Sequence, residues 1–492
     1  MKRNPFWRPG LTLLPLSAAL ALASTPGLAD EETPKVVEET PAPVYAPGQE
    51  PITSEIFHRF TAETGYGPEG SRLGEDRTAF YNLRYEPSFA WYSPEKRWAK
   101  WQLFGRLMFN YSSDENSVTT QDENQRQVEG FSAEAREFYV RRNLLWDDAR
   151  FSVSVGRQRY FDRFGIWWDD TLESVRFDYR DTFASGFVAI GEKFKYYNTK
   201  ENSLDPREDD IAYLMGEYSY RLDANNWTGV RAQLQRDHSG DDTEDGEDFS
   251  GLRLGLFVRG DRIDSPFLSD YHLELATLFG RIETPTTIDN FGVVRQGDRE
   301  NTRGWALLGE VGKQFPTLPW TPRISLRAGI TDKPDDEFDG FRLNNLQSDR
   351  VTNPETYNTG AASSFVRLSM RNLAFYSLGV ETRPHPRGHL DFRVSDIYQR
   401  NRDLGAASNQ DFALRGLGAR TNSYGIYRGP TADRSVGQVY DVNYFWEMFP
   451  IAHEGRYLNM HLLVNASYFD AGDAMKNVGD DSQVTVGVVV RY

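Results

Sequence analysis

The side chains in this sequence best suited to chemistry are arginines, which recur at one parity of short segments where apolar and polar residues alternate. Six of them stand opposite the apolar residues of their segments: Arg106, Arg231, Arg253, Arg259, Arg327 and Arg393. A guanidinium presents a planar fork of N–H donors that matches a carboxylate. Each arginine could pair with an acid such as Glu274 or Asp391, and as a set the arginines suggest a path for anions.

Enzymatic and metal-binding chemistry has little support. His385 and His389 lie in HPRGH, a turn-like segment, and their spacing would suit a metal ion only on a helix. The sequence has no G-x-S-x-G, H-E-x-x-H or phosphate-binding motif. The acidic run 239–250 lacks the full calcium-loop pattern and is interpreted as a solvated loop, although calcium binding there stays open. We therefore expect no enzyme, no cofactor and no metal site.

The segments that carry the arginines are predicted to be β-strands. In residues 101–111 one parity is apolar or aromatic, whereas the other contains Gln102, Arg106 and Asn110. Successive side chains of a strand point to opposite faces, so the first set is expected to meet lipid and the second a lumen. The pattern recurs in residues 228–235, 252–259, 271–279, 324–330 and 390–394. A helical period is missing throughout.

The N-terminal residues predict export. Lys2, Arg3 and Arg8 precede the apolar run 11–23, which is too short for a mature membrane helix, and small residues follow at 27–29. Residues 1–29 are therefore predicted to be a signal peptide, with a membrane anchor as the alternative. Residues 30–53, rich in Pro and Glu, are predicted to be a flexible leader, and residues 54–492 a single transmembrane β-barrel.

Composition and the C-terminus favour the same fold. Cysteine is absent, which excludes disulfides and thiolate chemistry, and the net charge of −16 argues against nucleic acid as a partner. Aromatic residues make up 14% although the mean hydropathy is −0.62, a combination that a barrel with polar loops explains. The last strand, QVTVGVVVRY, ends at aromatic Tyr492. We predict an all-β outer-membrane barrel of about 16 to 18 antiparallel strands with an aqueous channel, in the bacterial outer membrane.

Several motifs strengthen this prediction. They are AREFYV (135–140), VGRQR (155–159), WDDTLESVRFDY (168–179) and EKFKYYNTK (192–200), followed by NLQSDR (345–350), VGQVYDVNYFW (436–446) and FDAGDA (469–474). Over nearly the whole chain after the leader, the sequence resembles the alginate export outer-membrane protein family, the alginate-permeable porins of alginate-secreting bacteria. The resemblance implies a barrel of 18 strands with an arginine-rich constriction for a polyuronate.

The resemblance also implies which residues form that constriction: Arg59, Arg84, Arg136, Arg159 and Arg350, with Glu137 and Asp169 nearby. This chain departs from the family pattern at Tyr196 and Lys200, where acids are expected, and in residues 462–469, which lack the expected arginines.

Two expectations concern position. Strict alternation places Arg157 and Arg159 with the outward-facing Val153 and Val155, so they reach the lumen only if a bulge intervenes or the strand ends there. The long connection 401–437 is expected, by resemblance, to be periplasmic and able to cover the pore mouth.

The expected function is therefore passive export of an anionic exopolysaccharide, alginate or a similar polyuronate, through an anion-selective pore. The expected partners are this polysaccharide, outer-membrane lipids and, by resemblance, a periplasmic lipoprotein scaffold. One alternative is an anion-selective porin for small solutes, and another is an exporter of a different acidic polysaccharide. A barrel enzyme or adhesin would instead have a lumen filled by side chains. The polymer, the gating loops and the oligomeric state stay open.

Overall fold

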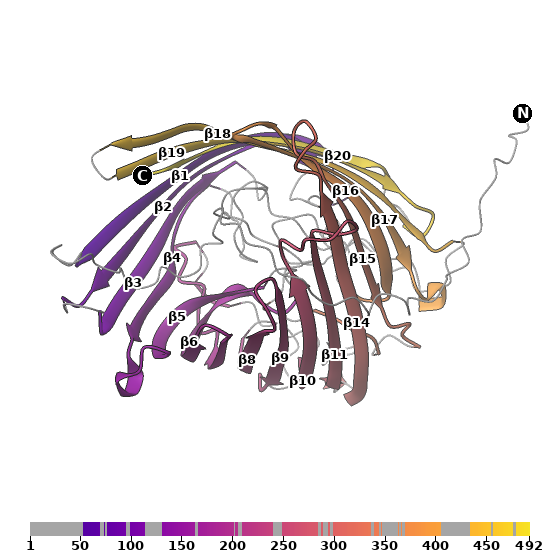
Figure 1. The fold of residues 1–492 in the computed structure, drawn as a ribbon. Coiled ribbons are helices and arrows are strands. Elements are labelled where there is room, and N and C mark those ends of the chain that lie inside the picture. The colour runs from indigo at the N-terminus through magenta and orange to yellow at the C-terminus, as the bar shows by residue number, and fades with distance from the viewer. Residues whose placement is uncertain are drawn as a thin grey trace, which may run out of the picture. The chain divides into compact units, whose positions relative to one another are not determined.

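The barrel is a single antiparallel sheet that closes on itself. The computed structural model describes residues 53–492 with breaks, the longest of which are 114–129, 347–362 and 405–432; the predicted signal peptide and nearly all of the leader lie outside the described residues. Eighteen strands form the sheet, and closure follows because β1 pairs both with β2 and with the last strand, β20. The strands surround a central space (Figure 1). The predicted barrel of about 18 strands is confirmed.

The strands of the wall are β1 (Ser54–Pro68), β2 (Arg77–Tyr92), β3 (Trp101–Ser112), β4 (Gly130–Arg142), β5 (Phe151–Phe161), β6 (Asp169–Arg180), β7 (Ala184–Glu192), β8 (Ile211–Arg221), β9 (Asn226–Asp237), β10 (Asp248–Gly260), β11 (Asp270–Glu283), β14 (Arg299–Gln314), β15 (Arg323–Thr331), β16 (Leu373–His385), β17 (Gly388–Gln399), β18 (Ser435–His453), β19 (Arg456–Ala471) and β20 (Asp481–Arg491). A small hairpin of β12 (Thr287–Ile288) and β13 (Val294–Arg295) and two 3-10 turns, η2 (Leu145–Asp147) and η3 (Arg402–Leu404), lie in the connections. No helix in the described part of the chain is long and apolar enough to cross a membrane.

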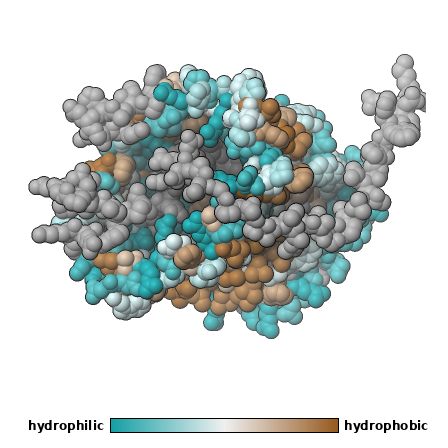
Figure 2. All heavy atoms as spheres, in the orientation of Figure 1, coloured by the Kyte–Doolittle hydropathy of each residue, from teal (hydrophilic) through white to brown (hydrophobic). Residues whose placement is uncertain are grey.

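Alternate side chains of each strand face lipid or lumen, as the sequence predicts. On β10, Leu252, Leu254 and Leu256 are 37%, 43% and 58% exposed, whereas Arg253 between them is only 2% exposed. Apolar residues are visible over a broad part of the surface in Figure 2. The exposed apolar parity is the lipid-facing surface, because leucine side chains on that scale would otherwise lie in water.

Aromatic side chains lie on the outer face near both ends of the barrel. Tyr81 and Tyr111 are neighbours near the end of β2 and β3 that faces away from the chain termini, with their ring centroids 5.9 Å apart. Trp91 and Trp101 lie near the opposite ends of the same strands and are 37% and 46% exposed. Two such belts suit the two interfacial levels of a bilayer, where an amphipathic ring has one wet and one apolar side.

The two ends of the barrel differ in the length of their connections. At the end where the termini lie, here called the terminal end, connections such as 181–183 and 222–225 are short. In the second of these, the Asp223 carboxylate accepts hydrogen bonds from the backbone N–H of Asn225 (2.8 Å) and Asn226 (3.0 Å), which lower the pKa of Asp223. Since outer-membrane barrels have short periplasmic turns and longer extracellular loops, the terminal end is the periplasmic end.

The same strand order corrects one expectation. β17 runs away from the terminal end and finishes at Gln399, and β18 starts back at Ser435. The connection 400–434 therefore begins and ends at the opposite end, here called the far end, which is extracellular. The prediction that this segment is periplasmic is wrong. Each strand crosses the membrane once, so the number of strands before a connection decides the side on which that connection lies.

The wall is irregular between β4 and β5. These strands pair only between Phe138–Arg142 and Val153–Arg157, and toward the far end they separate. The free edge of β4 is instead taken by a segment that follows β7: the N–H of Ala135 donates to the carbonyl of Tyr197 (3.2 Å), and the N–H of Thr199 donates to that of Ala133 (2.9 Å). The inserted segment provides hydrogen-bond partners for backbone groups of β4, which hydrocarbon cannot provide.

The lipid-facing assignment leads to a depth-dependent prediction. Leu326 lies on the outer face near the middle of β15 and is 51% exposed, whereas Leu318 lies in the terminal-end connection and is 50% exposed. Leu326→Arg should lower the free energy of unfolding by about 2 to 4 kcal/mol, and the matched control Leu318→Arg by about 0 to 1 kcal/mol. Reversible unfolding in urea, in lipid vesicles, measures both. Equal effects of the two substitutions would show that Leu326 does not lie near the middle of the membrane.

Candidate functional site

Four strands at the beginning of the chain carry one group of lumen-facing charges. This first arginine wall consists of Arg59, Arg84, Arg106 and Arg136 with the acids Glu86, Glu134 and Glu137, on β1 to β4. Glu86 lies between two arginines, 3.5 Å from an Nη of Arg59 and 3.9 Å from an Nη of Arg106. Arg106 also pairs with Glu137 at 2.7 Å, and Arg136 pairs with Glu134 at 3.4 Å.

A β-bulge in β4 brings an extra charge into this wall. The pairing of β3 with β4 shifts by one residue between Arg106 and Leu107, so Arg106 lies opposite Glu137 while Leu107 lies opposite Ala135. An extra residue in one strand places two consecutive side chains on the same side of the wall. Arg136 and Glu137, adjacent in the AREF motif, therefore both meet neighbours inside the barrel.

A second arginine wall lies on the later strands. It consists of Arg323, Arg327 and Arg393 with Asp270, Glu310 and Glu381, on β11 and β14 to β17. Glu310 accepts from both Arg323 and Arg327, each at 2.7 Å. Arg323 also pairs with Asp270 at 2.5 Å and with Glu381. Each wall is thus a network of alternating arginines and carboxylates.

The two walls face each other across the lumen. In the closed order of eighteen strands, β3 and β15 are nearly opposite, and Figure 1 shows them on the left and right sides of the barrel. Arg59 is the sixth residue of β1 and Arg327 the fifth of β15, both counted from the terminal end. Each of these two arginines therefore lies no farther than the middle of its strand from the terminal end.

In each wall one shared carboxylate, Glu86 or Glu310, is more deeply buried than its arginines, whereas Glu381 of the second wall is more exposed than Arg323 and Arg393. The Glu86 side chain is 2% exposed, against 15% for Arg59 and 14% for Arg106. The Glu310 side chain is 4% exposed, against 11% for Arg327. The guanidinium groups of Arg59, Arg106 and Arg327 are therefore more accessible from the lumen than the carboxylates of Glu86 and Glu310.

Of the other expected constriction residues, only Arg159 has a side chain within the described part of the structure. Arg159 lies on the same face of β5 as Val153 and Val155, since the pairing of β5 with β6 has no register shift, and its guanidinium lies 5.7 Å from the ring of Phe161. The placement of Arg159 in the constriction beside Arg136 stays a prediction. Arg350 and the side chain of Asp169 lie outside the described residues.

Arg157, which the constriction did not include, has the clearer role. Its Nε donates to the carbonyl of Arg136 (3.0 Å), and its Nη1 donates to Glu173 (2.8 Å) and to the carbonyl of Lys195 (3.2 Å). It is 2% exposed. Arg157 therefore fills the point where β4 and β5 separate. The alternation of the sequence indicated that Arg157 does not have the parity of a lumen residue. It gave no information about the groups that Arg157 binds.

The remaining predicted arginines face inward and are bound to neighbours. Arg231 donates to Glu217 (2.7 Å) and Glu274 (2.5 Å), so Glu274 is one of the acids with which a lumen arginine pairs. Arg253 donates to the carbonyl of Arg342 (2.7 Å), and Arg259 lies 5.3 Å from the ring of Trp227.

The far half of the lumen differs from the expected aqueous channel, because it holds a large buried apolar cluster. Wall residues from β6 to β19 contribute, and so do segments that enter from the far-end connections, including Ile166, Trp167, Trp168 and Phe341. Beside this cluster the carboxyl of Asp162 is fully buried, and burial together with nearby Glu274 raises the pKa of Asp162 to about 6 despite the opposing effect of Arg231.

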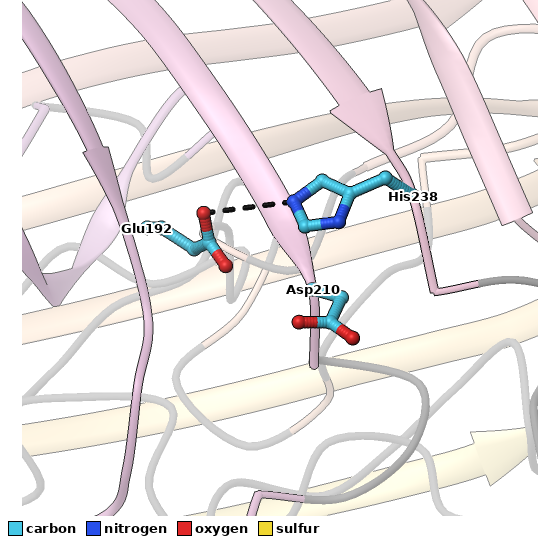
Figure 3. Close-up of side chains that lie close together, drawn as sticks. All are labelled: Glu192, Asp210 and His238. Atoms are coloured by element: carbon cyan, nitrogen blue, oxygen red, sulfur yellow. Dashed lines mark ion pairs between the residues drawn. The ribbon is translucent and has the colours of Figure 1, made fainter.

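One group of side chains has metal-ligating chemistry. Glu192, Asp210 and His238, at the far ends of β7, β8 and β9, have ligand atoms within 4.8 Å of one another (Figure 3). The imidazole Nε2 of His238 lies 3.6 Å from Glu192 Oε2. The His238 side chain is 43% exposed, so this group lies at the rim and takes no part in lining the lumen. Residues 240–247, within the acidic run, lie outside the described residues.

The closed antiparallel barrel defines an outer-membrane porin fold, which locates the chain in the bacterial outer membrane. Solved structures with this fold include OpdK of Pseudomonas aeruginosa (8% identity, covering 89% of this chain and 98% of that one, TM-score 0.51). Another is OccAB1 of Acinetobacter baumannii (8% identity, covering 89% and 96%, TM-score 0.50). At this identity the likeness concerns the fold alone.

A match in sequence is shorter. The alginate production protein AlgE of Pseudomonas syringae pv. tomato is 29% identical over 113 residues, which are 23% of this chain and 23% of that protein. The match thus spans less than a quarter of the relative's length. No family model matches the chain.

The burial order of the first wall makes a prediction about ion selectivity. Glu86→Gln should raise the preference for anions, because it removes the acid beneath Arg59 and Arg106, and Arg106→Gln should lower it. A change of one charge in a narrow lumen alters the local potential by about kT, so each permeability ratio should change roughly twofold. Reversal potentials in a salt gradient measure this, with the exposed turn variant Arg387→Gln as the control. If both variants shifted the anion-to-cation permeability ratio in the same direction, the proposed positions of Glu86 and Arg106 in the lumen wall would be contradicted.

Proposed function

We propose that this barrel is a passive outer-membrane channel that exports an anionic polysaccharide of the polyuronate class, alginate or a close chemical relative. The observation that carries the proposal is the pair of opposed arginine walls, in which guanidinium groups cover more deeply buried carboxylates. Such a lumen attracts a chain of carboxylates and repels cations, since each wall directs N–H donors toward the space between them.

The paired acids suit transport better than unpaired arginines would. A polyuronate has one carboxylate per sugar, so a wall of unpaired guanidinium groups would hold it at many sites at once. Glu86 and Glu137 compete with the polymer for the N–H donors of Arg106, to which they lie at 3.9 Å and 2.7 Å. Each contact with the polymer is therefore weak and exchangeable, which transport through a pore requires.

The sequence resemblance supports the same substrate class. The motifs AREFYV and VGRQR correspond here to the bulge of β4 and to the arginine that joins β4 to β5. The departures at Tyr196 and Lys200 fall in the segment inserted along the edge of β4, where the N–H of Tyr196 donates to the carbonyl of Asn202 (3.3 Å), rather than in either arginine wall. These two departures therefore leave the charges of the two arginine walls unchanged. A periplasmic lipoprotein scaffold at the terminal end is proposed on the resemblance alone.

Two related functions use the same walls. An anion-selective porin for small solutes would need the guanidinium groups but no affinity for a polymer, and an exporter of another acidic polysaccharide would differ only in the spacing of its charges. The buried apolar cluster of the far half favours a dedicated substrate over free diffusion of small solutes, because it narrows the lumen.

The experiment is conductance of the purified protein in a planar bilayer. Anions should carry most of the current, and uronate oligomers should reduce it more than neutral oligosaccharides of equal length. Combined replacement of Arg59, Arg106 and Arg327 by Gln should weaken the oligouronate block by about tenfold, since each charge-assisted contact contributes about 0.5 kcal/mol in a wet lumen. A cation-selective pore, or equal block by neutral oligomers, would refute the proposal.

Secretion tests the polymer itself. In a producing bacterium that lacks its own exporter, this chain should restore export of the polyuronate, and the triple Gln variant should restore less. A variant with the same number of Arg→Gln changes at exposed positions, Arg262, Arg383 and Arg387, is the matched control. Full restoration of export by the triple Gln variant of the lumen would show that these arginines are not needed for export.

A further inference from the structure

The apolar cluster in the far half of the lumen contains two segments that enter from the connections and pack against the wall. One is the connection between β5 and β6, of which Ile166, Trp167 and Trp168 are each 1% exposed. The other follows β15 and contributes Phe341, also 1% exposed. When large apolar side chains of a loop are buried inside a barrel, their apolar surface is removed from water, and this stabilises the buried position of the loop.

The first segment is held by a buried carboxylate. Asp162 Oδ1 accepts hydrogen bonds from the backbone N–H of Trp167 (2.9 Å) and Trp168 (3.0 Å). The indole N–H of Trp167 donates to Glu274, on the lumen face of β11. Arg231 lies among the acids, 2.5 Å from Glu274 and 3.9 Å from Asp162. The segment is therefore tied to the wall by a connected set of charge-assisted hydrogen bonds.

The second segment is held in the same region. The N–H of Gly340 donates to the carbonyl of Arg303 (2.9 Å), and the N–H of Phe341 donates to Asp332 (2.9 Å). The guanidinium of Arg253 donates to the carbonyl of Arg342 (2.7 Å). Arg253 on β10 and Arg231 on β9 thus hold the two segments from neighbouring strands.

Two glycines of the wall make room for these segments. A Cβ added at Gly255 would lie 2.2 Å from the indole of Trp167, and one added at Gly304 would lie 2.1 Å from the backbone nitrogen of Phe341. Neither distance is compatible with the present packing. The wall is therefore shaped to receive both segments, which are seated in it rather than lying loosely within the lumen.

We propose that the segments of Trp167 and Phe341 form a plug that closes the channel at rest, and that the contacts of Trp167 with Glu274 and Gly255 are its latch. The plug lies between the arginine walls and the extracellular end, and its apolar surface offers nothing to a hydrated polyanion. Passage requires that the plug leave its seats. This inference rests on the barrel being a channel and not on the identity of the polymer.

The test is potassium chloride conductance of three variants of the full chain. Gly255→Ala places a methyl group where the indole of Trp167 lies, and Trp167→Ala removes the indole without any clash. Both should raise the mean conductance above that of the native protein by threefold or more, on the order of the change expected when a constriction opens. Gly105→Ala is the matched control, because a Cβ there meets nothing within 4 Å, and it should conduct as the native protein does.

Heat-modifiable migration on gels establishes that each barrel has closed. Native-level conductance in folded Trp167→Ala and Gly255→Ala would overturn the plug, as would a native protein that already conducts like the two variants. Failure of the polymer proposal looks different: the variants would still conduct more, but uronate oligomers would block them no better than neutral oligomers.

Discussion

The closure of the hydrogen-bonded sheet is the constraint on which the rest of this molecule depends. In hydrocarbon an unpaired backbone N–H or C=O has no water to bind, so a membrane-spanning sheet can have no free edge. Here β1 pairs with β20 over residues Arg59 to Tyr66, and this contact removes the last edge. Closure also divides the side chains into two sets, one for lipid and one for the lumen, so the chemistry of the lumen is confined to one parity.

The fork between β4 and β5 shows how strict that constraint is. Where the two strands separate, the edge of β4 is covered by the segment after β7, and the buried guanidinium of Arg157 binds backbone carbonyls from both sides of the gap. A charged group is stable there because its Nε and Nη1 donate hydrogen bonds and it is paired with Glu173 at 2.8 Å. β5 leads directly into the connection in which Trp167 is buried.

The lumen has two halves of opposite character. On the two arginine walls, arginines and carboxylates form networks in which Glu86 and Glu310 lie deeper than arginines with which they pair. Toward the outside, inward-folded segments and wall residues form an apolar cluster. A polyanion could wait at the first half without passing the second. The proposed attraction and the proposed closure therefore belong to separate side chains.

The sequence by itself determined the parity of each strand. Period-two alternation placed Arg106, Arg231, Arg253, Arg327 and Arg393 in the lumen, and the same rule showed that Arg157 and Arg159 did not fit there. The number of strands followed from length, and pairing of the lumen arginines with acids such as Glu274 was one of the interpretations that the sequence allowed. These features are local, or need only the fact that strands alternate.

Only the tertiary structure decided which charges meet and what fills the lumen. The bulge that turns Glu137 toward Arg106, the two arginine walls on opposite sides and the seats of Trp167 and Phe341 all depend on the register between segments that are distant in sequence. The side of the membrane on which residues 400–434 lie depends on the full count of strands. A period of two assigns each side chain to a face of its own strand, but it carries no information about which residue of another strand lies beside it.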